Sequence, residues 1–381
     1  MMQSIAHRKI EIIRACSNMS SELVNYHMAK GQEELQLLFT YEPRIYYREM
    51  FDFQWTCRQV AWSDTISCLL SMFHHLGFAK SLNISKTTLL TFIMTARVTY
   101  RDLPYHNWAH AFSVAHFSFV LMHHLQLIRR CLITEVEGAA FFISALCHDL
   151  DHRGTTNSFQ IIANNSLAYL YGSEGSILER HHFSTTLRIL NTDNCNLFEN
   201  FTVPQYARVV NLIRDMIVAT DMNQHLQILP EQRKAISLGT YEPGKKYHRF
   251  LLTSLMMTCC DLNDQVKGWI YCRDVAEKIS LEFFNQGDME KEMGRTPVDM
   301  MDRDRAFIPR VQLNFVNDIC VPCYTVVVSL FPELEGLLDS IKDTAYRWKR
   351  AIEWFKLNAI PENLSLGFIF NSDLVQYVLE R

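Results

Sequence analysis

Two short clusters of histidine and aspartate most constrain what this chain can fold into. The first is Tyr-His-Asn-Trp-Ala-His at 105–110, and the second is His-Asp-Leu-Asp-His-Arg-Gly at 148–154. Each lies beside an apolar run of helical character, such as 141–146. An aspartate at the end of such a run is costly to bury without a metal, a cation or several hydrogen-bond donors. Imidazole and carboxylate together suit zinc and other divalent ions, whereas the simpler interpretation is a pair of exposed histidine-rich turns.

The spacing inside the clusters predicts how their side chains share a face. His106 and His110 are four residues apart, and His148 and His152 repeat that spacing, so on a helix each pair would project from one side. If these two clusters bind a metal ion, one supplying a histidine pair and the other an adjacent His and Asp, a fourth protein ligand would come from elsewhere in the chain. The best candidate is Asp261, which closes the apolar stretch 251–260, although alone it is equally an ordinary helix-end residue.

Composition predicts an all-α protein. Only 13 Gly and 10 Pro occur in 381 residues, and Leu, Met, Phe and Ala recur at helical rather than alternating spacing. The length allows one large domain with extensions. We expect a helical N-terminal extension over 1–60, a compact multi-helix domain over 61–350 and a C-terminal tail over 351–381. The extension would pack on the body or mediate pairing of subunits as a homodimer.

Charge and cysteine content narrow the class of protein further. A net charge of −4 gives no reason to expect nucleic-acid binding. The 11 cysteines show no small-scaffold framework, which indicates a reducing compartment and a cytoplasmic protein. The lone C-x-x-C of Cys320 and Cys323 favours a structural role over a redox or zinc role. We expect no membrane span and no signal peptide, so any membrane association would come from segments outside this sequence.

An ordered set of further motifs makes a family resemblance clear. It runs from about 65 to 348 and comprises the two clusters above together with Leu-Glu-Arg-His-His-Phe at 178–183, Ala-Thr-Asp at 219–221, Cys-Asp-Leu at 260–262, Glu-Phe-Phe-Asn-Gln-Gly-Asp at 282–288 and Gln-Leu-Asn-Phe at 312–315. In this order they resemble the catalytic domain of class I cyclic nucleotide phosphodiesterases, within the metal-dependent HD hydrolases.

The finer resemblance is to the cGMP-stimulated, dual-specificity type 2 branch. It is carried by Phe-Ser-Val at 112–114, by 175–183 and by Lys-Gly-Trp at 267–269. Members of that branch usually carry regulatory GAF domains upstream, for which this chain has no room. It would be either a short form or the catalytic part of a longer product, so activation by cGMP is not assumed for it. Two departures stand out: Ser280 lies next to Ile279 where the branch carries a bulky Tyr, and Thr156 replaces an Asn.

The resemblance implies a reaction and its metals. The reaction is hydrolysis of the cyclic 3′,5′-phosphodiester of cAMP and cGMP to 5′-nucleoside monophosphates, by a hydroxide bridging two metals. Asp149 would bridge a first ion, zinc, to a second, magnesium or manganese, whose other ligands are mostly waters. The protein ligands of the first ion would be His110, His148, Asp149 and Asp261.

The resemblance also assigns supporting roles around the phosphate. His106 would act as general acid on the leaving 3′ oxygen, with a fifth metal ligand as the alternative. Glu179 would orient His106 and keep it charged, unless it is only a solvated surface residue. Asp151 and His152 would fix ligand rings and metal-bound water, unless they form an ordinary helix-end ion pair. Thr220 would hold a water of the second metal, while Asn157, His181 and His182 would be structural supports.

A base pocket is implied later in the chain. Gln312 presents an amide donor and acceptor, so a rotatable amide can satisfy either adenine or guanine. Phe315 would stack on the purine, and on spacing alone such an aromatic is more often core than pocket. The remaining substrate-binding residues would be Tyr105, Ile279 and Phe283.

Three alternatives to a dual-specificity phosphodiesterase stay open. One is a phosphodiesterase specific for a single cyclic nucleotide, because the sequence does not fix the orientation of the Gln312 amide. A second is a phosphatase or nucleotidase of the wider HD group, against which the motifs at 178–182 and 312–315 argue. The third is a catalytically silent nucleotide-binding scaffold, which loss of a metal ligand would favour, although all four are present.

Overall fold

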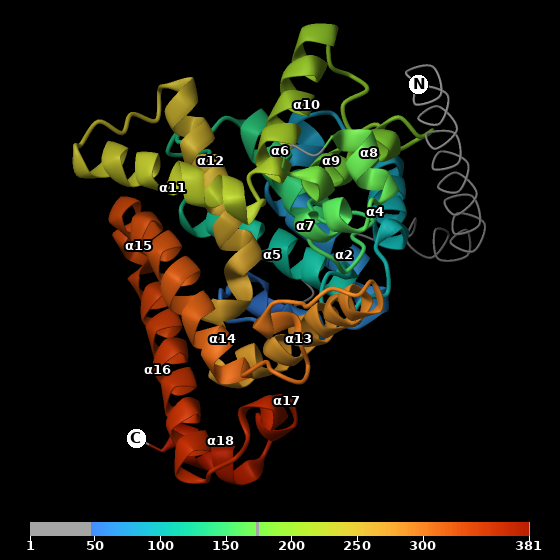
Figure 1. The fold of residues 1–381 in the computed structure, drawn as a ribbon. Coiled ribbons are helices and arrows are strands. Elements are labelled where there is room, and N and C mark those ends of the chain that lie inside the picture. The colour runs from blue at the N-terminus through green and yellow to red at the C-terminus, as the bar shows by residue number, and fades with distance from the viewer. Residues whose placement is uncertain (1–46, 173–174, 381) are drawn as a thin grey trace. The chain divides into compact units, whose positions relative to one another are not determined.

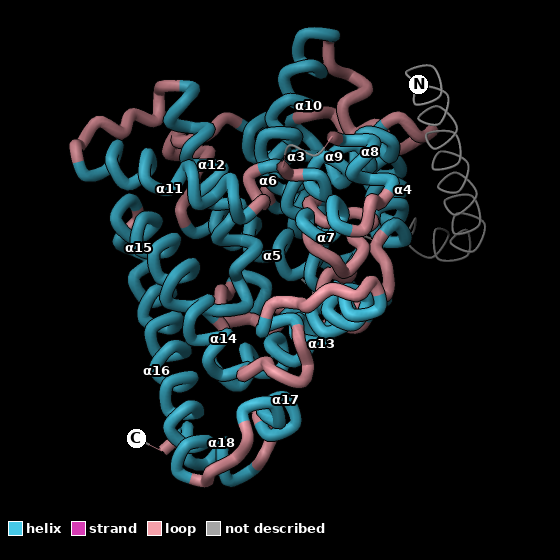
Figure 2. The backbone as a smooth tube through the Cα atoms, in the orientation of Figure 1, coloured by secondary structure: helices cyan, strands magenta, loops and turns pink. Residues whose placement is uncertain are grey.

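The computed structural model describes residues 47–172 and 175–380, and within those ranges the regular elements are all helices (Figure 2). The prediction of an all-α protein is therefore confirmed. The described chain divides into two compact units. The first unit comprises 47–50, 57–102 and 106–224, and the second comprises 51–56, 103–105 and 225–380.

The first unit carries the earlier helices of the chain (Figure 1). Its elements are the 3₁₀ helices η1 (Arg48–Phe51) and η2 (Cys57–Gln59), followed by α2 (Trp62–His75), α3 (Phe78–Ser81), α4 (Lys86–Thr99), α5 (Trp108–His124), α6 (Glu135–Cys147), α7 (Asn157–Ile162), α8 (Ser166–Tyr171), α9 (Ile177–Leu190) and α10 (Val203–Val218).

The second unit carries the later helices and includes most of α11 (Met222–Ser237). Its remaining elements are α12 (Lys246–Asp261), η3 (Leu262–Val266), α13 (Trp269–Glu292), η4 (Asp299–Met301), α14 (Ile308–Phe315), the π-helical segment η5 (Val316–Cys320), α15 (Val321–Leu330), η6 (Pro332–Leu334), α16 (Glu335–Leu357), η7 (Glu362–Leu364), α17 (Ser365–Phe368) and α18 (Ser372–Leu379).

Helices α5 and α6 form the centre of the first unit. Nearly every side chain of both is buried, because α6 packs between α5 and α10. Aromatic rings join the surrounding helices to this centre: Phe73 of α2 lies edge-on to Phe78 and to Phe142, with centroids 5.5 and 5.9 Å apart. The first histidine cluster leads into α5 and the second follows α6. The core packing of these two helices therefore positions both clusters.

Local sequence explains where these two helices begin and end. Asn107 caps α5, since its side-chain oxygen accepts hydrogen bonds from the backbone N–H groups of Ala109 and His110. Thr134 and Glu137 form a capping box at the start of α6. Helix α6 stops at Cys147, and Asp151 then adopts a left-handed conformation with φ of 59° that turns the chain back. The second cluster therefore lies in a turn.

In the second unit, α14, η5 and α15 form one continuous helical run against α16 (Figure 1). The π-helical segment ends just before Pro322, which has no N–H to continue an i to i−4 hydrogen-bond ladder. The run 308–330 is long and apolar enough to cross a membrane by length and composition, a test that core helices of soluble proteins also pass. The expected absence of a membrane span stays a prediction.

The predicted domain limits are not tested by these units. The proposed extension over 1–60 lies largely outside the described residues. The limit at 350 falls within α16 (Glu335–Leu357), which carries the chain from the predicted catalytic domain into the predicted tail. Helix α18 packs back against α16.

Gly287 allows α13 to pack closely against η4. A Cβ at this position would lie 1.9 Å from the carbonyl oxygen of Met301, which is backbone and not a flexible side chain. Helix α13 and η4 can therefore hold their present contact only with glycine at 287.

We expect Gly287→Ala to lower the free energy of unfolding of the second unit by about 2 kcal/mol or more, the cost of overpacking a close contact. Gly336→Ala is the matched control, because a Cβ at Gly336 of α16 meets nothing within 4 Å and alanine favours helix. Denaturant unfolding of the two variants measures the difference. Equal stability of both variants would contradict the inference that the contact between α13 and η4 requires glycine at 287.

Candidate active site

Three ligand-type side chains converge where the beginning of α5 meets the end of α6. The Nε2 atoms of His110 and His148 lie 3.2 Å apart, and Asp149 Oδ2 lies 3.5 and 3.3 Å from them. Both histidines are fully buried and Asp149 nearly so. The structure therefore brings together His110, His148 and Asp149, three predicted ligands of the first metal.

The histidine rings are held so that nitrogen lone pairs face Asp149. Nδ1 of His148 donates to the carbonyl oxygen of Ala145 at 3.0 Å, and Nδ1 of His182 donates to that of Leu150 at 2.7 Å. A carbonyl can only accept, so Nε2 of each neutral ring carries the lone pair. Lone pairs and a carboxylate facing one buried point suit a divalent cation, and carbonyl-anchored rings are typical of metal-ligating histidines.

His110 is held differently. A guanidinium nitrogen of Arg58 lies 2.9 Å from its Nδ1. Because a guanidinium only donates, Nδ1 accepts here and the ring proton lies on Nε2. Ligation by Nε2 would require the neutral ring to change tautomer, which moves its proton to Nδ1 and breaks the contact with Arg58.

Asp149 faces imidazoles with both of its oxygens. Oδ2 faces His110 and His148, whereas Oδ1 lies 3.6 Å from Nε2 of His182. Ligand atoms of Asp149, His152 and His182 also lie within 4.8 Å of one another. Burial raises the pKa of Asp149, whereas a proton on a neighbouring imidazole, His148 first, lowers it well below its usual range. A carboxylate with imidazole nitrogens on both sides would suit a pair of divalent ions.

His106 stacks on His152, with ring centroids 4.0 Å apart. Nδ1 of His152 accepts a hydrogen bond from the N–H of Gly154. Burial, reinforced by His106, holds the pKa of His152 well below its usual range. His152 is therefore the neutral member of the stack.

The predicted helical placement of the two clusters is wrong in part. His106 lies before Asn107, the cap of α5, and not on a turn of that helix next to His110. His152 likewise lies beyond the end of α6 rather than one helical turn after His148. The cap and the left-handed Asp151 cause both differences. Even so, His106 lies close to His110, with ring centroids 5.8 Å apart.

Asp151 holds the turn that follows α6. Its carboxylate accepts hydrogen bonds from Arg101 at 2.7 Å, Arg153 at 3.0 Å and His181 at 2.8 Å. Burial alone would raise the pKa of Asp151, but these three partners, His181 first, lower it. The contacts of Asp151 thus fix the loop that presents His148 and Asp149.

Glu179 on α9 accepts hydrogen bonds from Asn157 at the start of α7. The side-chain amide of Asn157 donates to both oxygens of Glu179, and its own oxygen accepts from the N–H of Leu178. Burial and the charge of Asp221 raise the pKa of Glu179 to about 7, although Asn157 opposes this. Asp221 itself accepts from the hydroxyl of Ser176 at 2.5 Å. The predicted action of Glu179 on His106 stays a prediction.

The other predicted residue of this unit is Thr220, which follows α10. Its hydroxyl donates to the carbonyl oxygen of Ile217 at 2.7 Å and it is half-buried. The oxygen keeps acceptor capacity, so its predicted role of holding a water is compatible with this bond.

The remaining predicted residues lie in the second unit. Asp261 is the last residue of α12 and is half-buried, so its role as fourth ligand stays a prediction. Tyr105 is fixed at both ends: its N–H donates to Glu282 Oε1 at 2.7 Å, and its hydroxyl donates to Asp264 Oδ2 at 3.2 Å. Tyr271 donates to the other oxygen of Asp264 at 3.1 Å.

The predicted base-pocket residues lie on two packed helices of this unit. Gln312 is buried on α14, and Phe315 is half-buried one turn later. Helix α13 packs against α14 and carries Ile279 and Phe283, which are also half-buried. The structure thus gathers these four residues on neighbouring helices.

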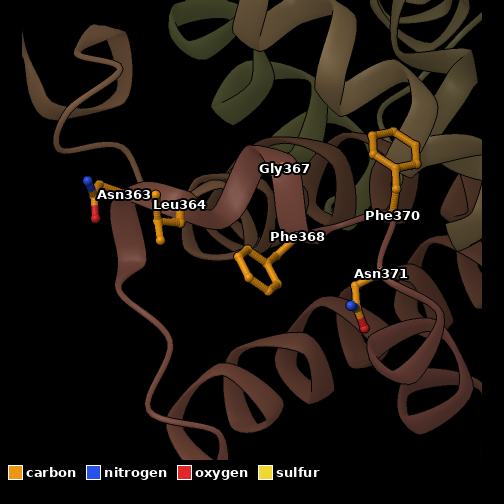
Figure 3. Close-up of a pocket in the computed structure, with 6 residues that line it drawn as sticks. All are labelled: Asn363, Leu364, Gly367, Phe368, Phe370 and Asn371. Carbon is orange, nitrogen blue, oxygen red and sulfur yellow. The ribbon is translucent and has the colours of Figure 1, made fainter.

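A different pocket lies around η7 and α17 (Figure 3). Phe368 and Phe370 extend from the backbone there, and no residue of its lining carries a titratable or metal-ligating group. We therefore do not assign the hydrolytic chemistry to it. Its lining residues are Asn363, Leu364, Gly367, Phe368, Phe370 and Asn371.

The structure places two further residues at this centre. His182, predicted to be a structural support, has its Nε2 3.6 Å from Asp149 Oδ1. The signal was available in the pair His181-His182 on a helix. Arg58 was not singled out, because nothing local in the sequence connects it with His110, which lies 52 positions later.

Comparison with known proteins gives consistent matches. Residues 105–341 match the family described as 3'5'-cyclic nucleotide phosphodiesterase. The dual 3',5'-cyclic-AMP and -GMP phosphodiesterase 11 of Drosophila melanogaster is 34% identical over 90% of this chain and 24% of that protein. The dual 3',5'-cyclic-AMP and -GMP phosphodiesterase 11A of Takifugu rubripes is 36% identical over 74% of this chain and 31% of its own. The probable 3',5'-cyclic phosphodiesterase pde-5 of Caenorhabditis elegans is 34% identical over 72% and 37%.

A solved structure matches as well. The phosphodiesterase domain of Salpingoeca rosetta rhodopsin phosphodiesterase superposes with a TM-score of 0.77 at 27% identity. The match covers 81% of this chain and 94% of that one. By contrast, the chain spans only about a quarter to somewhat over a third of the curated relatives' length.

We expect His148→Ala and Asp261→Ala each to lose bound divalent metal, because each variant would lack one predicted ligand. Metal content of dialysed protein, measured by atomic emission spectrometry, checks this. His74→Ala is the control, since His74 is exposed at the end of α2 and should leave the metal content unchanged. Full metal content in His148→Ala would contradict the ligand assignment.

Proposed function

Because the chain belongs to the 3',5'-cyclic nucleotide phosphodiesterase family, as its motifs indicated, we propose that it hydrolyses cAMP and cGMP to 5′-nucleoside monophosphates. The observation that carries this proposal is the convergence of His110, His148 and Asp149 in one buried centre. Two relatives named as dual cAMP and cGMP phosphodiesterases support the choice of both substrates. Those two are type 11 proteins, so a position nearest the type 2 branch stays a prediction.

The donor set fits divalent ions. Family membership implies dependence on divalent metal, and the carbonyl-anchored imidazoles of His148 and His182 provide suitable donors. We assign zinc to the nitrogen-rich side formed by His110, His148 and Asp149 with Asp261, and magnesium or manganese to the other side of Asp149. Bound there, such ions would lower the pKa of a water molecule and neutralise phosphate charge.

The chain's own residues supply the proton for the leaving group. His106 would donate to the 3′ oxygen as the phosphorus–oxygen bond breaks. Its stacking on a neutral His152 supports this role, because two imidazoles 4.0 Å apart in a partly buried site do not both hold charge. The hydrogen bonds to Asp151 keep the turn rigid while this transfer takes place.

Recognition of the base would fall to the second unit. The amide of Gln312 can present either a donor or an acceptor to a purine edge, which is the requirement for taking both nucleotides. Phe315 would stack on the base, with Ile279 and Phe283 of α13 completing the apolar wall. Tyr105, held by Glu282 and Asp264, would line the same pocket.

Hydrolysis of cAMP and cGMP by the purified chain, side by side with and without a chelator, tests this function. We expect both substrates to be converted and both activities to be lost on chelation, because divalent ions would be needed to activate the attacking water. Turnover of one nucleotide alone would reject dual specificity but keep the family reaction. No turnover by metal-loaded protein would favour a silent nucleotide-binding scaffold.

We expect His106→Gln to lower kcat by roughly 10²–10⁴-fold, the usual contribution of a general acid. Metal content should stay at the wild-type level, since His106 is not a ligand in this scheme. Steady-state kinetics and metal analysis on the same preparation separate the two roles. Loss of metal with loss of activity would instead make His106 a ligand.

A further inference from the structure

Two buried cysteines of the second unit face each other across a helix interface. Cys259 of α12 and Cys323 of α15 have their sulfur atoms 3.4 Å apart, and both side chains are buried. Helix α12 packs against α15, and the Tyr324 hydroxyl donates to the carbonyl oxygen of Cys259 at 2.8 Å. This hydrogen bond from a side chain to the backbone joins α12 to α15 next to the two cysteines.

The surroundings of Cys323 favour its thiolate. Burial alone would raise the pKa of Cys323, but hydrogen bonds with Cys259 and with His225 of α11, together with the charge of His225, lower it to about 6. His225 is itself buried. A thiolate held beside a thiol is the arrangement from which disulfides form.

We propose that Cys259 and Cys323 form a reversible thiol–disulfide site, closed by peroxide oxidants, that cross-links α12 to α15. The C-x-x-C spacing suggests Cys320 as the partner of Cys323 instead. Among the described residues, however, the thiol contact of Cys323 is with Cys259, which lies 64 positions earlier. The pairing follows helix packing and not sequence proximity.

The chemistry balances with hydrogen peroxide as the two-electron oxidant. The Cys323 thiolate attacks one peroxide oxygen, the O–O bond breaks, and hydroxide leaves and takes up a proton, which gives a sulfenic acid. The Cys259 sulfur then attacks the Cys323 sulfur. The S–O bond breaks, and water leaves with the Cys259 proton. Two thiols are oxidised to one disulfide while one peroxide is reduced to two waters, and a dithiol reverses the step.

Closing the site requires little movement. The sulfur atoms must approach from 3.4 Å to about 2.0 Å, the length of a disulfide bond. Both side chains lie in a packed core, so oxidant reaches them through local opening of the interface. Oxidation should accordingly be slower than at the exposed Cys131, yet end in a disulfide and not in higher oxides.

The position of the site gives it a regulatory consequence. Cys259 lies two residues before Asp261, the predicted metal ligand at the end of α12, and α15 continues the helical run that carries Gln312. A cross-link between these helices shifts both residues together. We therefore expect the oxidised form to hydrolyse cyclic nucleotides more slowly, a consequence that rests on the proposed function, whereas the disulfide itself does not.

The experiment treats the full chain with hydrogen peroxide, blocks the remaining thiols with an alkylating agent and maps disulfides by peptide mass spectrometry. We expect a peptide containing Cys259 joined to one containing Cys323, absent after treatment with dithiothreitol. A Cys320–Cys323 bond would overturn the proposal. So would alkylated, unpaired Cys259 and Cys323 under conditions that fully oxidise Cys131.

Matched variants identify the bonded sulfur on each helix. Cys259→Ser should abolish the cross-link, whereas Cys260→Ser and Cys320→Ser should retain it. If Cys259→Ser does not fold, Cys259→Ala and fragmentation spectra of the wild-type cross-linked peptide make the same distinction. A cross-link that persists in Cys259→Ser would assign the bond to Cys260 and overturn the pairing.

Activity is read on the same samples. We expect roughly tenfold to hundredfold slower hydrolysis in the oxidised wild type, the effect of displacing site residues by about 1 Å, with recovery in dithiothreitol. Peroxide-treated Cys259→Ser should match its own untreated rate. A disulfide without any change in rate would overturn the regulatory consequence. If the untreated protein is inactive, the proposed function fails while peptide mapping still decides the disulfide.

Discussion

Asp149 lies buried with imidazole nitrogens of His148, His110 and His182 at 3.3, 3.5 and 3.6 Å from its carboxylate oxygens. A buried carboxylate is stable only with partners, and two of these imidazoles turn lone pairs toward it because their other nitrogens are bonded to carbonyl oxygens. The donor set of this cluster therefore suits a divalent cation, and the packing of α5 and α6 is what assembles that donor set.

The end of α6 is what makes this geometry available. A helix continued through residue 152 would place His148 and His152 on one face, but would remove the turn that directs Asp149 back toward His110. The left-handed conformation of Asp151 prevents the helix from continuing. Its carboxylate accepts hydrogen bonds from Arg101, Arg153 and His181, which hold the turn. Local backbone strain at Asp151 is thus offset by charge-assisted hydrogen bonds.

Sequence predicted much of the fold and part of the centre, for identifiable reasons. Helical periodicity and scarce glycine predicted the helices, and the two clusters predicted the meeting of His110, His148 and Asp149. Asn is a preferred capping residue and Asn107 starts α5 after His106, whereas the equal spacing of the histidines predicts that both lie on the helix. The approach of Arg58 to His110, and of His182 to Asp149, depends on packing between distant helices, which no local pattern records.

The contact between Cys259 and Cys323 is another that no local sequence pattern records. A C-x-x-C pair draws attention to neighbours in sequence, whereas α12 brings Cys259 to Cys323 across 64 positions. That packing also fixes what a cross-link there can affect, because α12 ends at Asp261 and the run containing α15 begins at Ile308, four residues before Gln312. The helices that carry the thiol pair are thereby continuous with the segments that hold two residues predicted to serve the metal and the base.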